Sequence, residues 1–275
     1  MSKKFPIVAA IPVYNMAESL SELLPQVLAQ GYDDVVVMDD ASTDGITHDV
    51  LHSFAPDITT VFGQANVGSG GNRNRIFSAL QDKCAIVHFL DADIRLKSED
   101  NPGKIRGIPM QNISFIGGLV LGKDGTQSTW NYGPRQCLHG DIGAMLQSQR
   151  VKLPRNFATG LLDPWPDPRV TPVARRIFWP LESNMIIRSD VLSRIGGFDE
   201  SIREHDIQLP AYRAHKLGLM AMFTPDIAVQ HLEVNIRPHN RGVRKILEEV
   251  RMIRTQYGWK EWLLPDGQFR PPEEK

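Results

Sequence analysis

The sequence predicts an α/β fold with a Rossmann-like, mostly parallel central sheet and helices on both faces. Short and almost continuous apolar runs alternate with segments whose apolar residues recur at helical spacing. This alternation is typical of strands buried on both faces and of the helices that cover them. Polar motifs follow several of the apolar runs directly. Because ligands bind beyond the carboxyl ends of the strands in such sheets, these motifs predict one shared site.

The first third of the chain contains the most regular part of this pattern. Apolar runs predict strands at residues 5–11, 35–38, 58–62 and 85–90. Helices are expected between them, at residues 17–30, 46–54 and 68–80. The first helix has its apolar residues on one face and is followed by Gly31, which is a common stop signal.

The second half of the chain is less regular. Residues 97–176 are rich in Gly and Pro and contain the apolar stretch 113–121, from which we expect further strands and loops on the same core. Helical patterns follow at residues 190–195, 204–217 and 243–257, the last of them amphipathic.

Composition and charge exclude several classes of protein. The chain has 275 residues with 31 basic and 32 acidic side chains, so it lacks the basic excess of a nucleic-acid-binding protein. No apolar run reaches the roughly 18 residues needed to span a bilayer, so we expect no integral membrane protein. Cys84 and Cys137 are isolated and lack metal-ligand spacing, which indicates a reducing compartment and a cytoplasmic location.

The motif Asp91-Ala92-Asp93 directly follows the expected strand at 85–90. Divalent cations such as Mg²⁺ and Mn²⁺ take oxygen ligands and are often held by one or two carboxylates together with substrate phosphates. A metal ion held there would neutralise a departing diphosphate. The alternative is a solvated turn with a helix cap, and the position after a buried strand leaves the two interpretations even.

Two further motifs belong to the same expected edge of the sheet. Asp40 follows the second strand, where a carboxylate accepts hydrogen bonds from a base or ribose or else caps the turn at Ser42. Residues 66–74 form a Gly-rich segment that opens a helix, whose N-terminal N–H groups favour anions, and Arg73 could reach a phosphate or base edge. This segment is not a Walker loop, and no Gly-x-Gly-x-x-Gly follows the first strand, which counts against a dinucleotide dehydrogenase.

The second half of the chain supplies two further candidates. Glu204-His205-Asp206 opens a helix, where acidic residues either complement the helix dipole or provide a general base for a reacting hydroxyl. His231 follows an apolar run, and a lone histidine is more often a structural residue than a metal ligand.

Taken together, these segments resemble family 2 glycosyltransferases, which are inverting enzymes of the GT-A fold. The resemblance is carried by residues 11–15, 36–45, 66–74, 89–93 and 184–200. His231 also stands where the family often has a metal-binding histidine. Each motif is weak alone, but the ordered set spans most of residues 5–231 and is specific.

The resemblance implies a role for each motif. The nucleotide of the donor would contact Pro12, Tyr14, Asn15, Asp40, Gly68, Arg73, Asp91 and Ala92, with Asp40 facing the base. Asp91, Asp93 and His231 would bind Mn²⁺ or Mg²⁺ on the diphosphate. Asp206 would deprotonate the acceptor hydroxyl. The family usually shows Glu-Asp where this chain has His205-Asp206, so Glu204 is the alternative base.

The resemblance also implies a domain organisation and an activity. We expect a GT-A domain at residues 1–233, with a nucleotide-binding part at about 1–96 and an acceptor-binding part at about 97–233. A C-terminal helical extension would follow at 234–275. The expected reaction moves a sugar from a nucleotide-diphosphate donor, a UDP-sugar by family default, to the hydroxyl of a glycan or lipid-linked glycan.

Two other functions are compatible with parts of the pattern. A catalytically inactive carbohydrate-binding or scaffold protein is disfavoured because all the expected acidic residues are present. A sugar nucleotidyltransferase would carry a Gly-rich loop with Arg and Lys after the first strand, which residues 12–15 do not supply.

The basic residues between 235 and 254 either dock on the core or in a homodimer contact, or make a peripheral membrane contact. Liposome flotation with and without residues 240–275 distinguishes these placements.

Overall fold

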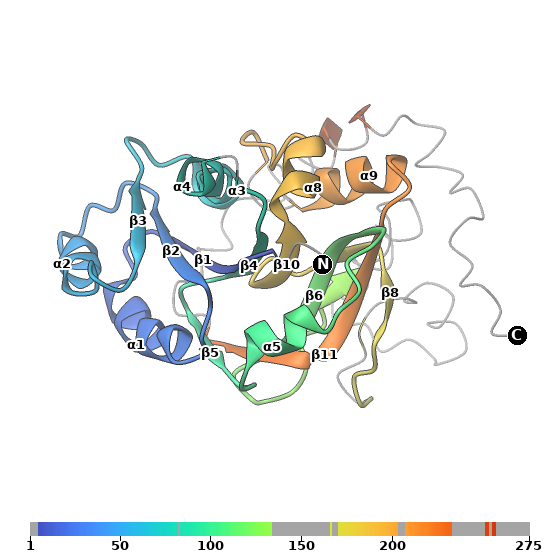
Figure 1. The fold of residues 1–275 in the computed structure, drawn as a ribbon, viewed down its shortest axis with the longest axis horizontal. Coiled ribbons are helices and arrows are strands. Elements are labelled where there is room, and N and C mark those ends of the chain that lie inside the picture. Colours follow the sequence, from blue (N-terminus) through green and yellow to red (C-terminus); the bar gives the residue numbers. More distant parts are fainter. Residues whose placement is uncertain are drawn as a thin grey trace, which may run out of the picture.

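The computed structural model describes residues 5–81, 83–133, 166, 170–202, 207–232, 251–252 and 255–256. The strands are β1 (Ile7–Val13), β2 (Asp34–Asp39), β3 (Thr59–Phe62), β4 (Ile86–Leu90), β5 (Ile94–Leu96), β6 (Ile113–Leu121), β7 (Tyr132–Gly133), β8 (Arg175–Ile177), β9 (Trp179–Pro180), β10 (Asn184–Arg188) and β11 (Met220–His231). The helices are α1 (Ala17–Leu28), α2 (Ile46–Ser53), α3 (Gly68–Asn74), α4 (Ile76–Leu80), α5 (Asn101–Arg106), α8 (Ser189–Arg194) and α9 (Gln208–Lys216) (Figure 1).

One large sheet organises the described chain. Its strands follow the order β3-β2-β1-β4-β10-β6-β11-β5, and β8 pairs with β11. β1, β2, β3 and β4 are parallel to one another, whereas β10 is antiparallel to both β4 and β6. β6 and β11 are again parallel to each other. As a result β1, β2, β4, β6 and β11 all end at the same edge of the sheet.

Helices cover both faces of this sheet. Val8 and Ala10 of β1 pack in the core that includes α4, α8 and α9, whereas Ala9 and Ile11 pack in the core that includes α1 and α2. Both faces of β1 are therefore buried, which is why its sequence is continuously apolar. Figure 1 shows α3, α4, α8 and α9 on one side of the sheet and α1, α2 and α5 on the other. The predicted fold class, a mostly parallel sheet between helices, is confirmed.

The helix expected at residues 68–80 is divided into α3 and α4. The division falls at Arg75, whose N–H donates to the Asn72 carbonyl at 3.1 Å and whose carbonyl accepts from the Ser78 N–H at 3.0 Å. These bonds join residues three apart, so the chain tightens into a 3₁₀-like turn. Apolar periodicity does not reveal a break of this kind, because the pattern continues across it.

Some expectations fall on parts of the chain outside the described residues. Helix α9 corresponds to the later part of the pattern at 204–217, but Glu204 and Asp206 themselves lie outside the described residues. The same holds for most of the amphipathic pattern at 243–257 and of the expected extension at 234–275.

Strand β11 is interrupted by a bulge. Thr224 pairs with Gly118 of β6, but the next pair along the strands is Ala228 with Leu119. Residues 225–227 therefore have no counterparts in β6. Beyond the bulge the strand continues between β6 and β5 to its end at His231.

A buried polar network crosses the middle of the sheet. His88 of β4 lies with Nδ1 2.7 Å from the Tyr32 hydroxyl and Nε2 2.8 Å from Asn184 Oδ1. The Asn184 amide nitrogen donates to the carbonyls of Leu119 at 3.1 Å and Ile227 at 3.0 Å, so its oxygen accepts and His88 carries its proton on Nε2. Both ring nitrogens of the neutral imidazole thus have partners. Burial lowers the pKa of His88 to about 4, and the hydrogen bond to Asn184 partly opposes this shift.

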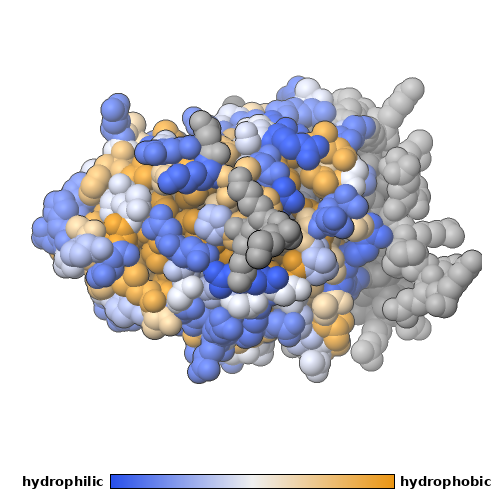
Figure 2. All heavy atoms as spheres, in the orientation of Figure 1, coloured by the Kyte–Doolittle hydropathy of each residue, from blue (hydrophilic) through white to orange (hydrophobic). Residues whose placement is uncertain are grey.

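The exterior has a mixed character on the face shown in Figure 2, where hydrophilic and hydrophobic residues intermingle. None of the helices in the described part of the chain combines the length and the apolar character needed to cross a membrane. Cys84 is exposed with a free thiol, and Cys137 lies outside the described residues.

Candidate functional site

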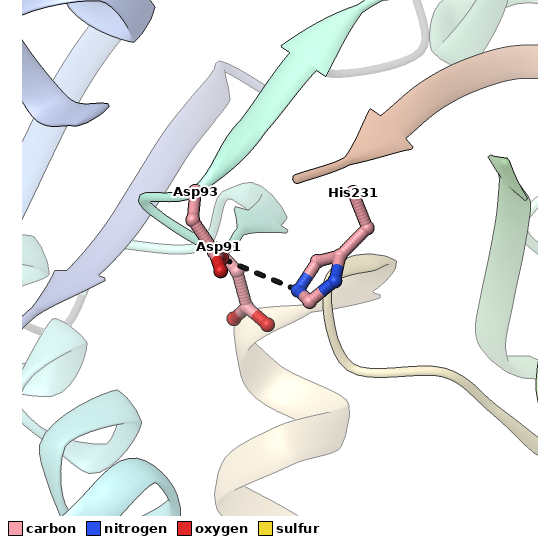
Figure 3. A group of neighbouring side chains, drawn as sticks. All are labelled: Asp91, Asp93 and His231. Carbon is pink, nitrogen blue, oxygen red and sulfur yellow. Dashed lines mark ion pairs between the residues drawn. The ribbon is translucent and has the colours of Figure 1, made fainter. Parts of the chain in front are cut away.

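Asp91, Asp93 and His231 converge at the carboxyl edge of the sheet (Figure 3). One carboxylate oxygen of each aspartate and one ring nitrogen of the histidine all lie within 4.8 Å of one another. The side chains of Asp91 and His231 are 30% and 28% exposed, whereas that of Asp93 is 10% exposed. Ala92 between the aspartates is buried. A ligand can therefore reach the cluster from solvent on one side.

The pairing of β5 with β11 brings Asp93 next to His231. Asp93 directly precedes β5, and its neighbour Ile94 pairs with His231 at the end of β11. The N–H of Leu232 donates to the Asp93 carbonyl at 2.8 Å, which extends the pairing past the end of the strand. His231 Nε2 lies 3.2 Å from Asp93 Oδ1. Sheet hydrogen bonds thus fix the backbone on both sides of this pair.

The cluster has the chemistry of a divalent cation site. Among the described residues it is the one group of three or more His, Cys, Asp or Glu side chains held this closely. Carboxylate oxygens suit Mg²⁺ and Mn²⁺, and an imidazole nitrogen favours Mn²⁺ over Mg²⁺ because Mg²⁺ prefers oxygen alone. The donor set fits Mn²⁺ or Mg²⁺, and three protein ligands leave coordination positions for phosphate oxygens or water.

Arg73 lies behind Asp91, on helix α3. Its Nη2 donates to Asp91 Oδ1 at 2.8 Å, and its guanidinium carbon lies 5.9 Å from the centre of the Phe198 ring. The Arg73 side chain is only 3% exposed. A charge-assisted hydrogen bond from a buried arginine fixes the orientation of the Asp91 carboxylate. The structure therefore joins two predicted site residues that lie far apart in the sequence.

Asp40 is buried where β2 meets the start of α3. Its carboxylate accepts hydrogen bonds from the N–H groups of Val67 at 3.0 Å and Gly68 at 2.9 Å, and it pairs with Arg75 Nη1 at 2.7 Å. Gly68 has a φ of 85°, a conformation that other residues rarely adopt. These contacts tie the Gly-rich segment to the end of β2 beside the expected nucleotide pocket.

The loop after β1 carries the other predicted nucleotide contacts. Pro12 is half-buried in β1, and the Tyr14 side chain is exposed. Asn15 Oδ1 accepts hydrogen bonds from the N–H groups of Thr43 at 2.7 Å and Asp44 at 3.2 Å. Asn15 therefore fastens the loop after β1 to the loop after β2, a structural task that the sequence motif alone does not reveal.

Sequence reasoning missed Arg75, which lies one residue past the Gly-rich motif. Besides Asp40, its guanidinium donates to the carbonyls of Asp39 at 3.3 Å and Ala65 at 2.8 Å. A Cβ on Gly63 would lie only 2.4 Å from the guanidinium carbon, so this glycine leaves the room that the arginine fills. The sequence gives no sign of these contacts, because they depend on the fold of the 63–68 loop.

The architecture of the described chain is that of the GT-A fold. Three structures illustrate the likeness, and the chain spans less than two thirds of each. Over 93% of its length the chain matches 62% of the mannosyltransferase PcManGT from Pyrobaculum calidifontis, in complex with GDP-Man and Mn²⁺, with a TM-score of 0.55 and 20% identity. Over 92% it matches 39% of S. aureus TarS, with a TM-score of 0.57 and 18% identity. Over 84% it matches 44% of GalNAc-T7 with UDP, GalNAc and Mn²⁺, with a TM-score of 0.55 and 13% identity.

A protein-family model matches the N-terminal part of the chain. Residues 8–108 match the model of glycosyl transferase family 2. The segment contains Asp40, Arg73, Asp91 and Asp93, whereas His231 joins the cluster from beyond it. No curated protein matches the chain.

Proposed function

We propose that the protein is an inverting glycosyltransferase that moves a sugar from a nucleoside-diphosphate donor to a hydroxyl of a glycan or lipid-linked glycan. The observation that carries this proposal is the cluster of Asp91, Asp93 and His231 at the carboxyl edge of a family 2 fold. Structures of PcManGT with GDP-Man and Mn²⁺ and of GalNAc-T7 with UDP and Mn²⁺ support it. The proposed donor is a UDP-sugar, which is the family default.

Different residues bind the metal, orient its ligands and accept the proton in the proposed reaction. Asp91, Asp93 and His231 would hold Mn²⁺ or Mg²⁺, and the bound cation would balance the charge of the donor diphosphate. Arg73 keeps Asp91 oriented through its 2.8 Å hydrogen bond. Asp206 accepts the proton of the acceptor hydroxyl as its oxygen bonds to the anomeric carbon and the bond to the diphosphate oxygen breaks. Attack opposite the leaving group inverts the configuration at that carbon.

Nucleotide binding is expected to depend on the metal. In calorimetry, UDP with Mn²⁺ should bind roughly 100-fold more tightly than UDP with EDTA, because without a cation the diphosphate meets two carboxylates within 4.8 Å of each other. GDP and dTDP, measured in parallel with Mn²⁺, identify the base. Absence of binding heat for all three nucleotides at millimolar concentration would contradict the proposal.

Asp206→Asn is expected to slow sugar transfer by about 100-fold or more while nucleotide binding stays near the wild-type level. The amide keeps the size of the side chain but cannot accept the acceptor proton. Single-turnover transfer and calorimetry with UDP and Mn²⁺ measure the two quantities separately. Glu204→Gln serves as the matched comparison. If Asp206→Asn keeps wild-type turnover and Glu204→Gln loses it, the base is Glu204.

A further inference from the structure

We propose that Asn184 is a positioning residue that sets the register of His231 by fixing the bulge of β11. The inference rests on the proposed function in one respect, namely that His231 is a metal ligand. It is carried by the contacts of a side chain that is fully buried in the middle of the sheet.

The bulge decides which residue of β11 reaches the metal cluster. Residues 225–227 are extra relative to β6, and their number is odd. Because side chains alternate between the two faces of a strand, an odd insertion exchanges the faces of every residue beyond it. A slip of one residue in the bulge would place Gln230 or Leu232 opposite Ile94 in place of His231. Leucine has no ligand atom, and glutamine offers only an amide oxygen.

The Asn184 amide joins the two strands at the bulge itself. Its nitrogen donates to the carbonyl of Leu119 in β6 at 3.1 Å and to the carbonyl of Ile227, the last bulge residue, at 3.0 Å. Gly118 leaves the space for this contact, because a Cβ there would lie 2.2 Å from the amide nitrogen and 2.5 Å from the Ile227 carbonyl oxygen. One side chain thus bonds a carbonyl of β6 and a carbonyl of the bulge at the same time.

His88 holds the amide in this orientation. Its protonated Nε2 donates to Asn184 Oδ1 at 2.8 Å, so a rotated amide would place its oxygen against two carbonyl oxygens and its nitrogen against an N–H donor. On the far side of the bulge, Ser98 Oγ accepts from the Ala228 N–H at 2.9 Å. The register is therefore held from two directions, by Asn184 at the Ile227 carbonyl and by Ser98 at the Ala228 N–H.

The first test uses the metal-free protein and hydrogen exchange of the amides at 229–232. Asn184→Leu removes both N–H donors of the amide and keeps a side chain of similar size. Gly118→Ala displaces the contact between the Asn184 amide and the Ile227 carbonyl, because the added Cβ would clash with both groups. Both variants should exchange these amides at least about 10-fold faster than wild type. Ser114→Ala is the matched control, because Ser114 Oγ donates to the carbonyl of Met220 at the opposite end of β11. This control should leave residues 229–232 at wild-type protection.

The second test measures Mn²⁺ affinity by electron paramagnetic resonance of the free ion. Asn184→Leu should weaken Mn²⁺ binding by about 10- to 100-fold, as outer partners of metal ligands do. His231→Ala should weaken it similarly in the wild-type background but add little in the Asn184→Leu background, since both changes remove the same ligand.

Each outcome has a definite meaning. Unchanged exchange at 229–232 in the variants, or fully additive effects of Asn184→Leu and His231→Ala, would overturn the inference. Gly118→Ala decides alone if Asn184→Leu does not fold. If the wild-type protein binds no Mn²⁺, the proposed function fails, and the exchange measurement still decides whether Asn184 sets the register.

Discussion

Asp93→Asn is expected to reduce sugar transfer by about 1000-fold, because it removes one charge from the proposed cation site. The Asp93 side chain is the least exposed of the three, and its Oδ1 lies 3.2 Å from His231 Nε2. Loss of a bound metal forfeits several kcal/mol of charge stabilisation in the transition state, and each 1.36 kcal/mol is tenfold in rate. Steady-state transfer with a saturating nucleotide-sugar donor and Mn²⁺ measures this effect.

The Asp93 variant has a matched control in Asp124→Asn. Asp124 lies in the exposed loop after β6, where its carboxylate binds the N–H and hydroxyl of Thr126. Its neutralisation changes the net charge equally but leaves the cluster intact, so transfer and Mn²⁺ affinity should stay within about twofold of wild type. Equal losses in both variants would show that general charge, and not the cluster, controls the activity.

Acidification is expected to destabilise the protein through His88. Burial holds the pKa of His88 at about 4, against 6.5 for an ordinary histidine. Below pH 6.5 the His88 imidazole binds a proton in the unfolded chain but stays neutral in the folded chain. The stability from this residue is therefore complete above pH 6.5 and is lost as the pH falls to 4, by roughly 3 kcal/mol in total. Urea denaturation at pH 7 and pH 4.5 measures the change.

The environment of His88 explains why the imidazole stays neutral. Its hydrogen-bond partners, Tyr32 and Asn184, are uncharged, and a second ring proton would meet the Tyr32 hydroxyl. His88→Gln should lower stability at pH 7 but remove most of the extra loss between pH 6.5 and 4. His52→Gln alters an exposed histidine on α2 and should keep the wild-type pH dependence. An unchanged pH dependence in His88→Gln would refute the assignment.

The sequence predicts the parts of this fold that depend on local pattern. The continuous apolar runs correspond to β1, β2 and β4 because both of their faces are covered by helices. The apolar stretch at 113–121 is β6 with the same bounds. The motif at Asp91 and Asp93 stands at a strand end, as expected, because the carboxyl ends of parallel strands share one edge.

Contacts between distant residues are the part that the sequence does not reveal. His88 and Asn184 are 96 positions apart, and each looks like an ordinary strand residue in its own segment. The number of extra residues in the β11 bulge is equally hidden, because only the pairing of β11 with β6 shows it. Arg73 was expected to contact the nucleotide. Its hydrogen bond to Asp91 was not foreseen, because it depends on the approach of α3 to the end of β4. The roles of Asp206 and Glu204 remain predictions.

The place of β11 in the sheet has a consequence for how the protein is made. β5 and β6 are synthesised well before β11, yet β11 lies between them and pairs with both. While the ribosome is still translating the segment before β11, β5 and β6 each lack the neighbour that β11 provides. Asp91 and Asp93 likewise lack the third member of their cluster until His231 has been synthesised. The proposed cation site can therefore form only after β11 has been inserted, so metal binding by a nascent chain would report the insertion of β11.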